Sequence, residues 1–370
     1  MDLIVKNILK LKYIIMLTAL FSSDFFPTEN VQLNYTQVQF YWPQIKDADY
    51  YVLYIDNGEE LYEVTSFENI LILDEFIDWG TNYTWQVCSV PIDAVVLSYY
   101  TDSIICHDSQ SFTVNNLPIE FPENLSIISN NQALYQSGIT ILDFESLGFS
   151  LGLDYDGLPV WFADKNQFSQ SKILVTQMLE TGNFMGFTSG KGYEFTIDSE
   201  IVFETPSNYQ VHHEIRKTSD NTYFFIDAEI EFNECPISDC ESQLGNLIPW
   251  QGDQFIEVNN SGEILWEWST FEYLSLNEIN LNWFYTYSTT GEFDWTHSNS
   301  VYYDKQNETV YLSIRNLSRI TAVDYNSKEI KWNLGNSDFM EEISFDQDLG
   351  FSHQHSVQKI SNGNLLFFDN

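Results

Sequence analysis

The feature that most constrains the fold of this 370-residue chain is an internal repeat that starts after about residue 116. In each copy a strand-like run leads into a turn containing Asp or Asn, and a second strand-like run then carries an aromatic residue. The four copies are LDYDGLPVWF, TIDSEIVFE, VNNSGEILWEW and VDYNSKEIKWNLG, with aromatic residues at Trp161, Phe203, Trp266 and Trp332. The aromatic residues are 42, 63 and 66 residues apart, a spacing typical of β-propeller blades with insertions.

A second element follows each copy of the repeat. The segments HSVQKISNGNLLFF from His355, HEIRKTSDNTYFF from His213 and LVTQMLETGNFMGF from Leu174 align without gaps. HSNSVYYDKQNETVYLSIR from His297 fits the same place with a longer strand and turn. Equivalent positions in successive blades face the same end of the central channel. We therefore expect His213, His297 and His355 to converge, although a single histidine at a strand edge is more often structural.

The segment before the repeat, residues 31–114, contains short alternating strand-like runs that predict a small β-sandwich. Its Trp42, Tyr51 and Trp85 are arranged as in a fibronectin type III module. The 28 Phe, 22 Tyr and 10 Trp of the chain lie in similar short runs throughout, so an all-β chain is expected. The predicted domains are this sandwich and a propeller over residues 116–370.

The N-terminus and the cysteines indicate export. Three lysines precede an apolar run over residues 13–21, the pattern of a secretory signal within residues 1–23, and the run is too short to span a bilayer. A buried first strand or a wrongly assigned start is the alternative. The four cysteines fit two disulfides in an oxidising compartment, so the protein is expected to be secreted or periplasmic. The spacing in CPISDC does not favour the competing possibility, a zinc site.

The net charge of −39 makes nucleic acid and anionic membrane surfaces poor partners. An anionic substrate would need a local group of positive side chains. The chain has only three arginines, Arg216, Arg315 and Arg319, and five of its six histidines share their stretch of sequence, His107 being the exception. The sequence therefore indicates an anion site there, with chance clustering in a base-poor chain as the alternative.

Three segments carry a resemblance to a known family. WTHSNS, VYLSIRNLSRITAVDYNSKEIKWNLG and FSHQHSVQKISNGNLLFFDN resemble the signature of bacterial-type aryl sulfotransferases, and the resemblance extends from about residue 116 to the end. It implies a six-bladed propeller behind a small β-sandwich, with a phenolic sulfate ester as donor and a phenol as acceptor. It implies no cofactor and no phosphoadenosine donor, and the glycine-rich GFTSGKG has the wrong spacing for a phosphate loop.

The resemblance also implies roles for individual residues. His355 of the QH motif would be the nucleophile that is transiently sulfurylated, and His297, Asn299 and Arg315 would contact the sulfuryl oxygens. The HHE motif supplies one more histidine, and strand alternation selects His213 rather than its neighbour because His213 aligns with His355.

Two neighbouring residues of the same types, His353 and Arg319, are expected to have other places. His353 would share a face with His355 in a regular strand, so it is the alternative nucleophile. Arg319, four residues beyond Arg315, is expected on the strand exterior.

The chain stops at Asn370, directly after FDN, inside the partner strand of the fourth copy. We therefore expect an incomplete propeller that forms an open arc, and the activity of such a chain is in question. The alternative function is a catalytically silent secreted propeller that serves adhesion or ligand binding.

Overall fold

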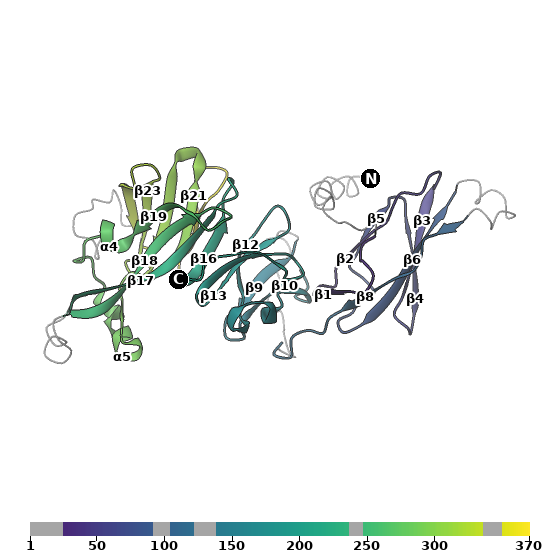
Figure 1. Cartoon of the computed structure of the whole chain (residues 1–370), viewed down its shortest axis with the longest axis horizontal. Coiled ribbons are helices and arrows are strands. Elements are labelled where there is room, and N and C mark those ends of the chain that lie inside the picture. Colours follow the sequence, from purple (N-terminus) through teal and green to yellow (C-terminus); the bar gives the residue numbers. More distant parts are fainter. Residues whose placement is uncertain (1–24, 92–103, 122–137, 237–246, 336–349) are drawn as a thin grey trace. The chain divides into compact units, whose positions relative to one another are not determined.

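The computed structural model describes residues 25–91, 104–121, 138–236, 247–335 and 350–370 (Figure 1). The predicted signal segment and Cys240 lie outside the described residues. The chain divides into two compact units, one extending to Lys165 and including Ile197–Glu200, the other comprising Asn166–Thr196 and Ile201–Asn370. The described part is mostly β, as the composition predicts, and its sheets are largely antiparallel.

The first unit contains two sheets before the repeat. The larger has the order β1-β8-β6-β3-β4, with β7 also paired to β6, and the smaller pairs β2 with β5. Phe40 of β2 packs on Trp85 of β6 and Phe112 of β8, with ring centroids 5.3 and 5.8 Å apart, so aromatic side chains fill the space between the sheets. These strands are β1 (Val31–Leu33), β2 (Val38–Tyr41), β3 (Tyr50–Asp56), β4 (Leu61–Ser66), β5 (Ile70–Leu73), β6 (Asn82–Val90), β7 (Ile105–Cys106) and β8 (Gln110–Val114).

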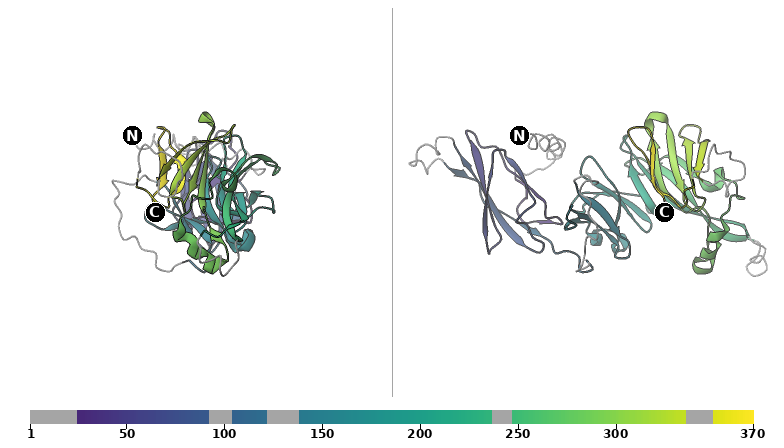
Figure 2. Two further views of the ribbon diagram at one scale, coloured as in Figure 1. Left: turned by 90° about the vertical axis from the view of Figure 1, so that its left-hand side faces the viewer. Right: turned by 180° about the vertical axis from the view of Figure 1, so that it is seen from behind.

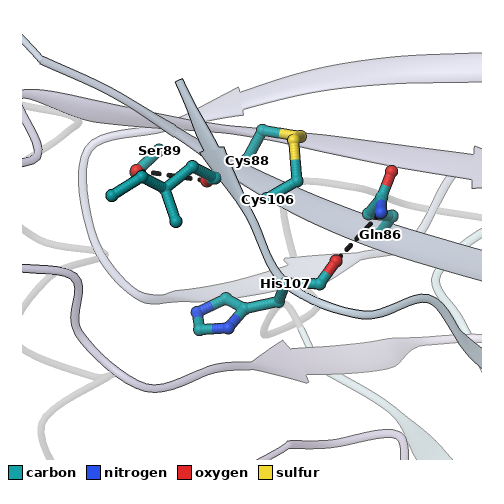
Figure 3. The surroundings of a disulfide bond; sticks show 6 residues. Gln86, Cys88, Ser89, Cys106 and His107 are labelled. Atoms are coloured by element: carbon teal, nitrogen blue, oxygen red, sulfur yellow. Dashed lines mark hydrogen bonds between the residues drawn. A yellow bond between two sulfur atoms is a disulfide. The ribbon is translucent and has the colours of Figure 1, made fainter. Parts of the chain in front are cut away.

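A disulfide joins Cys88 of β6 to Cys106 of β7, a pairing that the sequence left open (Figure 3). His107 follows it, and its carbonyl accepts a hydrogen bond from the side chain of Gln86 at 2.9 Å. The first copy of the repeat forms a three-stranded sheet in the same unit, from β9 (Thr140–Phe144), β10 (Phe149–Leu153) and β11 (Pro159–Phe162).

The second unit is a succession of antiparallel sheets. The first of these sheets has four strands, the third has four and the last has two. The second sheet has five strands, because β20 pairs in parallel with β18 in addition to the four in sequence order. The strands are β12 (Leu174–Met178), β13 (Phe184–Thr188), β14 (Lys191–Phe195), β15 (Ile201–Glu204), β16 (Val211–Lys217), β17 (Tyr223–Glu234), β18 (Leu247–Val258), β19 (Ile264–Ser269), β20 (Phe293–Asp294), β21 (Ser298–Asp304), β22 (Thr309–Ile314), β23 (Arg319–Asp324), β24 (Ile330–Gly335), β25 (His355–Lys359) and β26 (Leu365–Phe368). The short helices are α4 (Thr270–Tyr273), η5 (Leu281–Tyr285) and α5 (Thr286–Thr290), in addition to the 3-10 turns η3 (Lys165–Gln167), η4 (Ser169–Ser171) and η6 (Lys305–Asn307).

The strand pairing confirms the alignment of the four repeat copies. In each copy the two strands shift register just after the turn, and the aromatic residue is paired at the next position. Trp161, Phe203, Trp266 and Trp332 therefore occupy one equivalent place, opposite Gly152, Glu194, Glu257 and Ala322 respectively.

The first strands of successive sheets in the second unit lie side by side, β16 beside β12, β21 beside β16, and β25 beside β21 (Figure 2, where the C-terminal hairpin is yellow). Side chains connect them. Thr176 donates to the carbonyl of Ile215 at 2.6 Å, and the backbone amide of Val301 donates to Glu214 at 2.7 Å. The backbone amide of Val357 likewise donates to the hydroxyl of Ser300 at 2.8 Å. The contacts hold the beginnings of these four strands together.

In the part of the chain that the structure describes, no helix has the length and apolar character needed to cross a membrane.

Candidate active site

Except for Arg315, which follows β22, the predicted site residues lie in or beside the first strands of three sheets, where these strands are irregular. In β16, Val211 pairs with Asp227 and Ile215 with Phe225, so three residues, His212 to Glu214, stand opposite one. In β21 the extra residue is Asn299, and in β25 two residues follow His355 before the pairing resumes. Such bulges re-aim side chains and are common beside active sites.

The backbone at these bulges is strained. His213, His297 and His353 have φ values of 58°, 46° and 53°, and Ser356 has 55°. Positive φ is uncommon for residues other than glycine, and several such residues at one place point to a functional constraint.

The structure brings His213 and His297 together. Their ring centroids are 4.7 Å apart and the ring planes cross at 67°. His212 is also there, because its Nδ1 lies 2.7 Å from Nδ1 of His213. In a regular strand, His212 and His213 would face opposite ways, as the choice of His213 alone from the HHE motif assumes. The bulge removes that alternation, so the two imidazoles lie side by side.

His355 begins β25 and is held by its neighbour Gln354, which is fully buried. The Gln354 side chain donates to Ser313 and to the carbonyl of Arg319, at 2.9 and 2.8 Å. The backbone carbonyl of Gln354 accepts a hydrogen bond from the side-chain nitrogen of Asn299 at 2.7 Å. Oδ1 of Asn299 is buried and has no hydrogen-bond partner among the described residues. Asn299 is thus tied directly to the residue before the predicted nucleophile.

Arg315 lies on an aromatic side chain. Its guanidinium carbon is 4.2 Å from the ring centroid of Trp283, and its Nη1 donates to Asn316 at 2.9 Å. His353 packs edge-on against the same tryptophan, with centroids 5.3 Å apart. His353 precedes β25, so it does not share a strand face with His355 as a regular strand would require.

The expectation that Arg319 lies on the strand exterior is wrong. Arg319 is fully buried and forms an ion pair with Glu278. It begins β23, and its guanidinium pairs with the buried carboxylate of Glu278, which compensates the charge inside the protein. Arg315, in contrast to Arg319, is only partly buried.

Burial controls the ionisation of the histidines. Desolvation, together with the neighbouring His212 and His297, lowers the pKa of His213 to about 2. Desolvation also lowers the pKa of His355; a backbone interaction with His353 opposes this, and the positive charge of Arg315 adds to it. Both imidazoles are therefore neutral at neutral pH, the state in which a ring nitrogen has a free lone pair.

Two carboxylates at the site were not predicted from the sequence. Nδ1 of His297 lies 2.5 Å from an oxygen of Asp294, and Nε2 of His212 lies 3.2 Å from an oxygen of Asp253. Asp294 could have been noticed from its place three residues before His297. Asp253 comes from the middle of β18, about 40 residues from either histidine, and no local pattern marks it.

No group of three or more His, Cys, Asp or Glu side chains among the described residues is arranged to hold a metal ion.

Comparison with known proteins gives a match over most of the chain. The family model described as Arylsulfotransferase (ASST) matches residues 112–370. No curated protein matches. Among solved structures, the chain is similar to hydrazine synthase of Kuenenia stuttgartiensis, with 10% identity over 84% of this chain and 80% of that chain and a TM-score of 0.30. It is also similar to the dihydro-heme d1 dehydrogenase NirN in complex with DHE, with 10% identity over 94% of this chain and 61% of that chain and a TM-score of 0.29.

Proposed function

This chain belongs to the arylsulfotransferase (ASST) family, and on that premise we propose that it transfers a sulfuryl group from a phenolic sulfate ester to a phenolic acceptor. The donor would be the aryl sulfate itself and no phosphoadenosine compound. The observation that carries the proposal is the meeting of His213, on β16, with His297, just before β21. Both lie in the family-matched region, which also contains Arg315 and His355.

The proposed reaction is a double displacement. A ring nitrogen of neutral His355 attacks sulfur, the bond from sulfur to the phenolic oxygen breaks, and phenolate leaves. The oxygen of the acceptor phenol then attacks sulfur, the bond from sulfur to the nitrogen of His355 breaks, and the new sulfate ester leaves. The proton of the acceptor passes to the phenolate released in the first step or to solvent, so His355 returns to its neutral form. The lowered pKa of His355 supports this role because only the unprotonated nitrogen is a nucleophile.

The remaining residues would stabilise charge on the sulfuryl oxygens. Arg315 supplies a permanent positive charge, and His213, His297 and Asn299 supply polar groups from two other strands. Fixed donors of this kind act where charge develops in the transition state, so catalysis would rest on positioning and electrostatics.

The finer organisation of the chain is part of the same proposal. We assign residues 116–370 to a sulfotransferase domain of the six-bladed propeller type, residues 31–114 to a fibronectin III-like module and residues 1–23 to an export signal. The equivalent pairing of the four repeat copies supports the propeller, and the Cys88–Cys106 disulfide supports a secreted or periplasmic location.

The test is to incubate the protein with a chromogenic aryl sulfate alone and to identify the modified peptide by mass spectrometry. We expect one sulfuryl group on His355, followed by its transfer when a phenol is added. Label on His353 would refute the assignment of the nucleophile. Absence of label and of turnover with every aryl sulfate tested would favour the silent, ligand-binding propeller.

A further inference from the structure

Two neighbouring residues hold the side chain of Arg315. The guanidinium carbon lies over the ring of Trp283, 4.2 Å from its centroid, and Nη1 donates a hydrogen bond of 2.9 Å to Oδ1 of Asn316. Among the described residues, Nε and Nη2 have no hydrogen-bond partner, and the side chain is only partly buried. These two nitrogens form one edge of the guanidinium, and such an edge can donate to two oxygens of one anion.

The amide of Asn316, which is fully buried, has one orientation that satisfies its partners. Its Nδ2 donates to the backbone carbonyl of Asp294 at 2.7 Å, and its Oδ1 accepts from Arg315. A guanidinium only donates and a carbonyl only accepts, so the flipped amide would lose both hydrogen bonds, whatever the protonation of the nearby histidines. The backbone amide of Asn316 also donates to the carbonyl of Thr296 at 3.0 Å. Asn316 therefore ties the guanidinium to the segment that leads into His297.

Trp283 lies on η5, among the short helices between β19 and β20. Asn280, which is buried, precedes η5 and connects it to Asn316. Its Oδ1 accepts from the backbone amide of Asn282 at 3.1 Å, and its Nδ2 donates to the carbonyl of Asn316 at 2.9 Å. The ring of Trp283 also packs edge-on against His353. The ring that covers the guanidinium is thus linked to the residue that accepts from Nη1.

We propose that Trp283 and Asn316 are positioning residues that orient the guanidinium of Arg315 toward the sulfuryl group. Trp283 covers one face of the guanidinium through a cation–π contact, and Asn316 fixes Nη1, so Nε and Nη2 remain for the sulfuryl oxygens. A free arginine side chain loses rotamer freedom when it binds an anion, whereas one that is already oriented loses less. Both residues act through Arg315 and not on the reacting atoms. This inference rests on the proposed function.

The first test is a double-mutant cycle between Trp283 and Arg315, measured as kcat/KM for a chromogenic aryl sulfate. We expect Trp283→Leu to lower kcat/KM about tenfold, and Trp283→Phe, which keeps an aromatic face, only about threefold. In an Arg315→Ala background, Trp283→Leu should cost less than about twofold, because the group it positions is absent. Equal losses in the two backgrounds would overturn the proposal. Trp332→Leu, at a partly exposed tryptophan of β24, is the matched control and should leave kcat/KM unchanged.

The second test is the same cycle for Asn316. Asn316→Ala should lower kcat/KM about tenfold or more, and its cost should be at least about fivefold smaller in the Arg315→Ala background. Asn333→Ala is the matched control, because it also removes a buried amide, one that accepts from Thr321 at 2.7 Å. This control should lower the thermal midpoint without changing kcat/KM. An Asn316→Ala variant whose cost is the same in both backgrounds would contradict the assigned role, and if that variant does not fold, the cycle with Trp283 decides.

NMR of the arginine side chains gives a readout that needs no turnover. The chain has only three arginines, so the Nε–H region contains three signals, and Arg315→Lys identifies the one of interest. Because Arg315 lies over an indole ring, its Nε–H proton should be shifted upfield, and Trp283→Leu should remove that shift. An unshifted signal in the wild type would refute the inference. If the shift is present but the wild type transfers no sulfuryl group, the proposed function fails and the positioning of Arg315 stands.

Discussion

Three of the four residues that have a positive φ in the bulged segments of the site are histidines. His213, His297 and His353 all lie in the left-handed region, where a non-glycine residue costs roughly 1–3 kcal/mol. Contacts with the surrounding residues must therefore stabilise these backbone conformations. In His213 and His297 the strain coincides with a ring contact between sheets, so it orients the two imidazoles toward one place.

The first prediction concerns charge stabilisation by single side chains. His297→Ala and Arg315→Ala should each lower kcat/KM for an aryl sulfate by about a hundredfold or more, because each removes a positive or polar group from the sulfuryl oxygens. Steady-state kinetics with a chromogenic donor measures this. The control is His107→Ala, on the disulfide-linked segment of the other unit, which should leave kcat/KM unchanged. Similar losses at His107 and His297 would contradict the assignment of the site.

At this scale the sequence predicts part of the site and misses part for a physical reason. The meeting of His213 and His297 follows from the repeat register, since equivalent residues of neighbouring sheets face the same way. The participation of His212 does not follow, because a three-against-one bulge leaves no mark on the hydrophobic pattern. Asp253 reaches the site by sheet pairing from a distant segment. Arg319 is buried against Glu278, which is 41 residues away in the sequence, and counting residues from Arg315 cannot reveal such a partner.

At the scale of strands, hydrogen bonds that involve side chains connect the sheets of the second unit. Thr176, Glu214 and Ser300 each bind the backbone of the next first strand. All three lie at or beside a bulge, where ladder bonds are missing. The side chains thus satisfy backbone groups that the irregular pairing leaves open.

Replacing one of these connections should loosen the strand that holds His355. Ser300→Ala removes the acceptor of the Val357 amide and leaves a buried donor unpaired, at a cost of about 1–3 kcal/mol. We expect a lower thermal midpoint, measured by calorimetry, together with reduced turnover. Ser361→Ala, in an exposed turn of the same hairpin, is the matched control. A midpoint equal to that of the control would show that the hydrogen bond does not hold the strand.

The net charge of the whole molecule opposes the binding of the proposed donor. A net charge of −39 repels an anionic sulfate ester, and the positive groups of the site act only at short range. Binding of the donor therefore has to overcome the field of the protein, whereas a neutral phenol does not experience it.

The expected consequence is an unusual response to salt. Raising the ionic strength from about 0.01 to about 0.15 M shortens the Debye length from about 30 to about 8 Å, and kcat/KM for the aryl sulfate should rise about twofold to tenfold. The KM of a neutral phenolic acceptor, measured in the same buffers, should not change. A decrease of kcat/KM with salt would instead show that the local field of the site outweighs the charge of the molecule.

The bulges of β16, β21 and β25 limit how this scaffold can be re-engineered. A design procedure that rewards regular strands would delete the extra residues or install glycine at the left-handed positions, and the product would gain ladder hydrogen bonds and thermal stability. It would also turn the histidines away from one another. New acceptor preferences are therefore better sought by varying residues around a fixed backbone at 211–215, 297–300 and 353–358, and stabilising changes belong in the outer strands.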